Sequence, residues 1–137
     1  MSTTIDAMRA EHKLLVDHLS KAKELGCYTP AAREFIYKVE QEFKDHLKKE
    51  DAELYRALHQ VAKTDTYTKN VLESFARELD AVTKDVVNFF EAHAKNSNHE
   101  HFEKDIVHLI ASVEARIVKE EHLLYPLYEK RVEKAAQ

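Results

Sequence analysis

The sequence predicts an all-α protein that folds as an antiparallel, up-down-up-down four-helix bundle. Only one glycine and two prolines occur in 137 residues, which is far fewer chain breaks than strands and hairpins require. Apolar residues recur at intervals of three and four along most of the chain, as in helices that are buried on one face. The connections between these periodic stretches are short, so neighbouring helices are expected to run antiparallel.

Two helices are predicted in the first half of the chain. The first spans residues 3–25 and is followed by Gly26, which can end a helix in the left-handed conformation. The second begins at Thr29-Pro30, where a capping side chain precedes a proline at the first helical position. The polar stretch 63–66 is expected to end this second helix.

Two further helices are predicted in the second half. The third carries an apolar stripe over residues 72–89, and the fourth carries one over residues 102–127. The polar stretch 95–98 is expected to form the turn between them. Pro126 removes one backbone hydrogen bond near the end of the fourth helix, where we expect a bend.

The second and fourth predicted helices resemble each other at an offset of 70 residues. Residues 46–55 read HLKKEDAELY and residues 116–125 read RIVKEEHLLY, which aligns Glu50 with Glu120. The chain is therefore predicted to consist of two helical-hairpin half-repeats. Such a pseudo-twofold bundle brings equivalent positions of its second and fourth helices to one depth, which is how metal sites in helical bundles are built.

Composition and charge exclude several classes of protein. The length fits one domain, residues 1–137. The net charge is -4 and both signs are mixed along the chain, so no basic stripe favours nucleic acid as a partner. No apolar run long enough for a membrane span or a secretory signal is seen. The single cysteine, Cys27, fits a reducing compartment, and we expect a cytoplasmic protein in which this thiol has no special role.

Four polar residues occupy core positions and form a candidate metal site. His46 and Glu50 leave one face of the second helix one turn apart, where apolar residues are expected. His12 lies 16 residues before Tyr28 and His46 lies 18 after it, so an antiparallel hairpin places both imidazoles at a similar depth. Glu120 reaches that depth through the repeat. Buried carboxylates are costly unless they are paired or bound to a cation, and nitrogen and oxygen ligands suit iron, manganese or zinc.

Arg116 complicates this interpretation. It stands at the repeat position of His46, one turn before Glu120, and a guanidinium cannot be a metal ligand. It can instead bridge Glu50 and Glu120 with hydrogen bonds. Two alternatives follow: Arg116 replaces a second metal and leaves one, or Arg116 and the carboxylates form a salt-bridged core without metal.

The same residues resemble the hemerythrin-like (HHE cation-binding) family over essentially the whole chain. The resemblance is carried by AEH at residues 10–12, by the HxxxE of residues 46–50, and by the paired segments EDAELY at 50–55 and EEHLLYP at 120–126. It implies a four-helix bundle that holds a non-heme di-iron centre with histidines and two bridging carboxylates. It also implies a role in binding or sensing oxygen, nitric oxide or iron in a stress response.

The second half of the chain departs from the family pattern. Its HxxxE histidine is replaced by Arg116, and the position that mirrors His12 is Leu79 or Val82. We therefore expect one iron, or an incomplete di-iron site, with another divalent metal as an alternative. The metal ligands expected from position are His12, His46, Glu50 and Glu120. The expected small ligand is O2 or NO, and the sequence does not define an oligomeric state.

Two rival functions stay open. One is a metal-free structural or interaction bundle with a salt-bridged polar core. The other is an iron-dependent oxidase or peroxide-consuming enzyme, although no separate general acid, nucleophile or phosphate loop is apparent, which favours a binding or sensing protein over an enzyme. Tyr55 and Tyr125 lie just beyond the carboxylates and are expected to pack there or to hydrogen-bond them. His93, His99 and His101 are expected in a solvated turn.

Overall fold

The computed structural model describes residues 3–93 and 101–134, and these form four long helical segments with no strand among them. The first is α1 (Thr3–Leu25), and the third is α4 (Thr66–His93). The second runs without a break through α2 (Pro30–Lys49), the π-helical turn η1 (Glu50–Tyr55) and α3 (Arg56–Ala62). The fourth comprises α5 (Phe102–Lys119), η2 (Glu120–Leu124), α6 (Tyr125–Tyr128) and η3 (Glu129–Glu133). The all-helical prediction is confirmed.

The helix ends follow the local signals in the sequence. Gly26 adopts a φ of 76°, the left-handed conformation expected after α1. The Thr29 hydroxyl accepts a hydrogen bond of 3.1 Å from the Ala32 amide, and Pro30 is the first residue of α2. The predicted break at 63–66 separates α3 from α4. The turn predicted at 95–98 lies outside the described residues.

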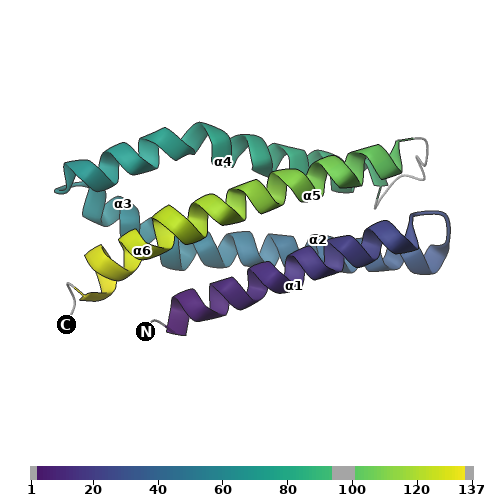
Figure 1. Ribbon diagram of the computed structural model, residues 1–137, viewed down its shortest axis with the longest axis horizontal. Helices are drawn as coiled ribbons and strands as arrows, with labels where there is room; N and C mark the ends of the chain where they lie inside the picture. The colour runs from purple at the N-terminus through teal and green to yellow at the C-terminus, as the bar shows by residue number, and fades with distance from the viewer. Residues whose placement is uncertain (1–2, 94–100, 135–137) are drawn as a thin grey trace.

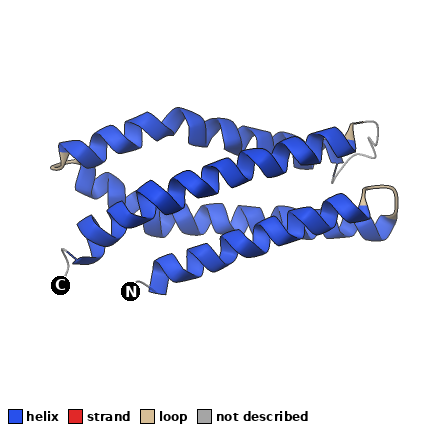
Figure 2. Ribbon diagram, in the orientation of Figure 1, coloured by secondary structure: helices blue, strands red, loops and turns tan. Residues whose placement is uncertain are grey.

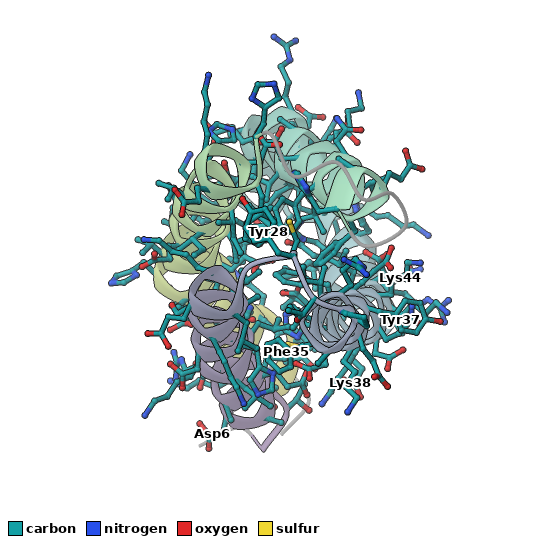
Figure 3. The ribbon with its side chains drawn as sticks, turned by 90° about the vertical axis from the view of Figure 1, so that its right-hand side faces the viewer. Asp6, Tyr28, Phe35, Tyr37, Lys38 and Lys44 are labelled. Atoms are coloured by element: carbon teal, nitrogen blue, oxygen red, sulfur yellow. The ribbon has the colours of Figure 1, made fainter. Side chains whose placement is uncertain are left out.

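The four segments pack side by side as a bundle (Figure 1). Neighbouring contacts join α1 to α2, α2 to α4, α4 to α5 and α5 back to α1, so the helices surround a common interior. In Figure 2 the loops lie at the ends of the bundle. The view along its length in Figure 3 shows charged side chains such as Lys38 and Lys44 directed outward. The chain stays helical across Pro126.

The interior consists of two apolar clusters with polar residues between them along the chain. One cluster includes Leu15 and Leu19 of α1 and Val113 of α5, and the other includes Met8 of α1 and Leu124 of η2. Burying a large apolar side chain contributes about 1.5–3 kcal/mol, so these clusters stabilise the bundle. The free energy gained by burying these apolar side chains offsets the unfavourable free energy of burying charged groups in the polar layer between them. No helix in the described part of the chain is long and apolar enough to cross a membrane.

Candidate metal centre

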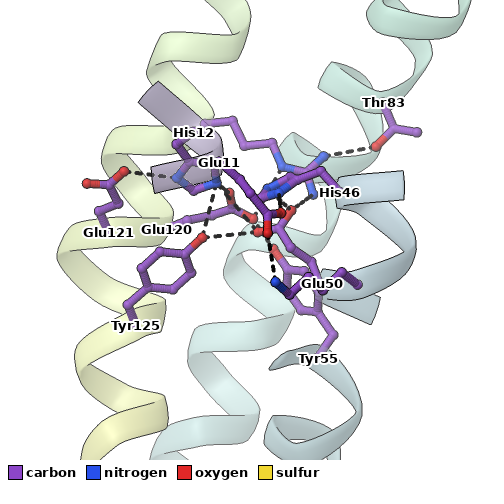
Figure 4. Close-up of polar contacts among 11 residues, drawn as sticks. Glu11, His12, His46, Glu50, Tyr55, Thr83, Glu120, Glu121 and Tyr125 are labelled. Atoms are coloured by element: carbon purple, nitrogen blue, oxygen red, sulfur yellow. Dashed lines mark hydrogen bonds and ion pairs between the residues drawn. The ribbon is translucent and has the colours of Figure 1, made fainter. Parts of the chain in front are cut away.

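The polar layer brings together the four side chains that the sequence singled out. His12 comes from α1 and His46 from α2, whereas Glu50 and Glu120 are the first residues of η1 and η2. Each of the four is at most 5% exposed. His46 Nε2 lies 3.2 Å from Glu50 Oε1, and His12 Nε2 lies 3.3 Å from Glu120 Oε1. Both imidazoles therefore face the buried carboxylates (Figure 4).

The spacing of these atoms fits a single metal ion. One ligand atom each from His12, His46 and Glu50 lies within 4.8 Å of the other two. Around an ion with bonds of about 2.1 Å, ligand atoms lie about 3–4 Å apart, so small side-chain adjustments suffice. The Nε2 atom of His46 is buried and makes no hydrogen bond within the described structure. Glu50 Oε1 lies 3.2 Å from this nitrogen as an ion-pair neighbour. Buried polar atoms usually make a hydrogen bond, and a cation bound here would be an alternative partner for this nitrogen.

Two outer carboxylates hold the imidazoles in position. His46 Nδ1 donates to Glu11 at 2.8 Å, and His12 Nδ1 donates to Glu121 at 2.9 Å. An ionised carboxylate can only accept, so Nδ1 carries the proton in each ring and Nε2 faces inward. Metal-bound histidines are commonly oriented in this way. Sequence reasoning missed both glutamates, although each is the chain neighbour of a predicted ligand.

The two repeated tyrosines contact the carboxylates of the opposite half-repeat. The Tyr55 hydroxyl donates to Glu120 at 2.6 Å, and the Tyr125 hydroxyl donates to Glu50 at 3.3 Å. Tyr125 Oη also lies 3.1 Å from His12 Nε2. Burial, followed by the neighbouring carboxylates, raises the pKa of both phenols. Both tyrosines therefore stay neutral donors, which supports the expectation that they hydrogen-bond the carboxylates.

Arg116 contacts both buried carboxylates from the second-half side. Its Nε lies 3.4 Å from Glu120 Oε2, and its Nη2 lies 3.7 Å from Glu50 Oε1. Its Nη1 donates to the Thr83 hydroxyl at 3.0 Å. The guanidinium thus bridges the two carboxylates, and its charge occupies the place where the repeat would put a second HxxxE histidine.

A small cavity adjoins the polar layer. Its volume is about 20 Å³, which is room for about one water-sized molecule. Val82 lines this cavity together with Arg116. Leu79 instead packs against the apolar cluster that contains Met8 and Leu124. Val82 is therefore the structural mirror of His12, as the offset of 70 residues also indicates. The remaining wall is mostly apolar and includes Leu15, Phe43, Val86, Val113 and Ile117.

The protonation of the centre is set by burial and by the paired charges. Burial lowers the pKa of His12, but hydrogen bonds with Glu120, Glu50 and Glu121 outweigh it and raise this pKa to about 10. The pKa of His46 is also raised, because Glu50 and Glu11 outweigh its burial. Burial raises the pKa of the Glu50 carboxyl, but hydrogen bonds with the two imidazoles have a larger effect, so this pKa is lowered overall. The pKa of Glu120 is raised, mainly by its burial. In the absence of metal, the raised pKa of His12 keeps its imidazole in the cationic form at neutral pH.

One prediction about the other histidines is wrong. His93 was expected in a solvated turn, but it ends α4 and is only 1% exposed. It packs edge-on against Phe102, and its Nε2 lies 2.8 Å from Asp105. Helix α4 extends far enough for this imidazole to close the end of the core. His101 is exposed as expected, and His99 lies outside the described residues. Cys27 is a buried thiol.

The fold and the polar layer define a class, the helical bundles with an internal centre of histidines and carboxylates. The family model of the hemerythrin HHE cation binding domain matches residues 3–128. The chain belongs to this family, as the sequence resemblance indicated. Comparisons with curated proteins and with solved structures gave no match.

Proposed function

We propose that the protein binds one non-heme iron ion in its polar layer. The ligands would be His12, His46 and Glu50, whose ligand atoms converge. Glu120, with its Oε1 3.3 Å from His12 Nε2, would be the fourth. The observation that carries this proposal is the convergence of two imidazole nitrogens and a carboxylate oxygen within 4.8 Å, with one of those nitrogens buried and without a hydrogen bond. Donors of this type suit iron, with other divalent metals as alternatives.

Charge balance supports one divalent ion instead of two. The layer and its immediate contacts contain four carboxylates and two permanent cations, which leaves a formal charge of −2 when all carboxyls are ionised. The groups counted are Glu11, Glu50, Glu120 and Glu121 against Lys49 and Arg116. Two imidazolium protons neutralise this charge, and so does one divalent cation with neutral imidazoles. A second divalent cation would leave an excess of +2 in a buried layer, which is costly.

The role that we propose is binding or sensing of O2, NO or iron itself, as part of a cytoplasmic stress response. An iron ion with four protein ligands has open positions for a small molecule. The cavity beside the layer, of about 20 Å³, has the size for such a ligand, and its wall is mostly apolar. Arg116 and the two tyrosines hold the carboxylates in place with hydrogen bonds.

Metal content tests this proposal directly. Protein produced with ample iron should contain about one metal ion per chain by elemental analysis, and His46→Ala should lose it. His108→Ala is the matched control, because His108 is 70% exposed and lies outside the layer. Spectroscopy of the iron-loaded protein should show a mononuclear ion and a change on addition of NO. Metal content near zero in the unaltered protein would refute the proposal.

A metal-free structural bundle is the second candidate, and the position of Arg116 favours it. The guanidinium and both imidazoles already contact the two buried carboxylates, so the layer can balance its charges without metal. In that case a chelator leaves the Tm unchanged. Arg116→Ala would then lower the free energy of unfolding by about 3–5 kcal/mol, because two buried carboxylates lose their cation. A chelator-induced fall in Tm would exclude this candidate.

We also infer that the bundle has an up-down-up-down topology built from two hairpin half-repeats. The π-helical turns η1 and η2 begin at Glu50 and Glu120, which are equivalent positions of the repeat. The reciprocal contacts of Tyr55 and Tyr125 across the layer follow the same pseudo-twofold relation. Successive segments run in opposite directions along the bundle in Figure 1, which supports this inference.

A further inference from the structure

A surface groove reaches the polar layer from outside. It lies between α1 and α2 and has a volume of about 250 Å³. Residues of both helices line it: Glu11, Leu14, Leu15, Glu42, Asp45, His46 and Lys49. His46 and Leu15 also line the internal cavity of about 20 Å³. These two side chains therefore form the partition between the groove and the centre.

The imidazole of His46 spans this partition. On the groove side its Nδ1 donates to Glu11 at 2.8 Å. On the inner side its Nε2 lies 3.2 Å from Glu50 Oε1 and makes no hydrogen bond. The side chain is 95% buried, since only 5% of it is exposed. His46 lines both the groove and the internal cavity, so its inner nitrogen lies behind the groove, beside Glu50. Figure 4 shows this imidazole among its polar neighbours.

The groove has an excess of negative charge. Glu11, Glu42 and Asp45 line it, and Lys49 is the one permanent cation among its lining residues. Lys49 Nζ contacts Glu11 at 2.7 Å, and the Glu42 carboxylate accepts a hydrogen bond of 2.7 Å from His18 Nδ1. The three lining carboxylates still outnumber the one permanent cation, so the field in the groove is negative. A concave surface with one sign of charge raises the local concentration of counter-ions and their rate of association.

Glu11 covers the groove side of the His46 imidazole. It is about one-third exposed, and it contacts both His46 and Lys49. Rotation of this side chain toward solvent requires no change in the packed core, and it frees the outer edge of the imidazole. All four proposed ligands are at most 5% exposed, so a metal ion needs such an opening to reach them.

We propose that this groove is the entry route by which a divalent cation reaches the buried centre. Glu42 and Asp45 attract the ion at the mouth, and Glu11 with His46 forms the gate. This inference rests on the proposed function, because it assumes that the centre binds a metal. Charges at the mouth act on entry and exit alike, so they change the rates of both without a large change in affinity.

Stopped-flow uptake of Co²⁺, followed by its absorption, tests the route. Glu42→Gln with Asp45→Asn should slow uptake about 3–10-fold at low salt. The difference should vanish near 1 M salt, where the Debye length is about 3 Å. The matched control is Glu73→Gln with Asp80→Asn, which changes the net charge equally at two exposed positions of α4. The control should load at the rate of the unaltered protein, and all three proteins should bind the same amount of Co²⁺ at equilibrium.

The outcomes separate the entry route from the metal centre itself. Equal uptake rates in the groove variant and the unaltered protein would overturn the route while the centre stands. Equal slowing in the α4 control would also overturn it, because general charge and not the groove would then govern uptake. Absence of Co²⁺ and iron binding in the unaltered protein would instead refute the proposed function. Circular dichroism of each variant verifies that its fold is retained.

Discussion

Restoring the second half-site should convert the centre from one metal to two. The perturbation is Val82→His together with Arg116→His. Both positions line the internal cavity, and they are the repeat equivalents of His12 and His46. The double substitution supplies two imidazoles at the place that the guanidinium now fills, opposite Glu120 and Glu50.

The expected magnitude follows from the charges of the layer. Removal of Arg116 changes the formal charge of the metal-free layer from −2 to −3, counted with neutral imidazoles. In the variant, binding one divalent ion brings the formal charge of the layer to −1, and binding a second brings it to +1. In the unaltered protein, which keeps Arg116, a second ion would bring this charge to +2. Metal content should therefore rise from about one to about two ions per chain. The metal-free variant should lose about 3–5 kcal/mol of stability, because the buried carboxylates lose their permanent cation.

Elemental analysis and absorption spectroscopy of the iron-loaded variants measure this outcome. The absorption of an oxo-bridged iron pair should appear in the double variant. The Val82→His single variant is the matched control, since it adds a ligand but keeps Arg116, and it should still bind one ion. Two ions in that single variant, or one ion in a well-folded double variant, would show that Arg116 does not determine the stoichiometry.

Three further predictions concern the groups around the centre. Glu121→Gln should weaken metal affinity about 10–100-fold by competition titration, because the carboxylate that orients His12 is lost; unchanged affinity would mean that the contact has no such role. Metal affinity should rise with pH by at least about tenfold per unit between pH 6 and 7.5, because His12, with a pKa of about 10, must release its proton to bind metal. A flat profile would contradict the raised pKa. Tyr55→Phe should lower the free energy of unfolding in urea by about 1–3 kcal/mol, because Glu120 loses a buried hydrogen bond, whereas Tyr37→Phe at an exposed position should leave it unchanged.

Local signals predicted the helices and their ends well. The left-handed Gly26, the Thr29 cap and the break before α4 depend on backbone preferences of a few adjacent residues. The four core polar residues were also predictable, because helical periodicity tells which face of a helix is buried and the repeat aligns Glu50 with Glu120. That these residues bind metal stays a prediction.

Contacts between helices were harder to predict. Glu11 and Glu121 are each adjacent in sequence to a core residue, and neither lies in the apolar stripe of its helix, so helical periodicity did not select them. Their carboxylates reach imidazoles on other helices only because of how the helices cross. The prediction that His93 is exposed was wrong for a related reason, because its burial depends on packing against Phe102 of the next helix.

The amino-acid sequence by itself determined that this chain is helical, where its first two helical segments begin and end, and that His12, His46, Glu50 and Glu120 enter its core. These properties follow from local conformational preference and from periodic burial, and both act over a few residues. The tertiary structure decided which partner each buried charge meets: Arg116 between two carboxylates, each tyrosine on the opposite half-repeat, and an outer glutamate behind each imidazole. Those pairings depend on the depth and crossing of helices that are distant in sequence, because a hydrogen bond needs its atoms within about 3 Å.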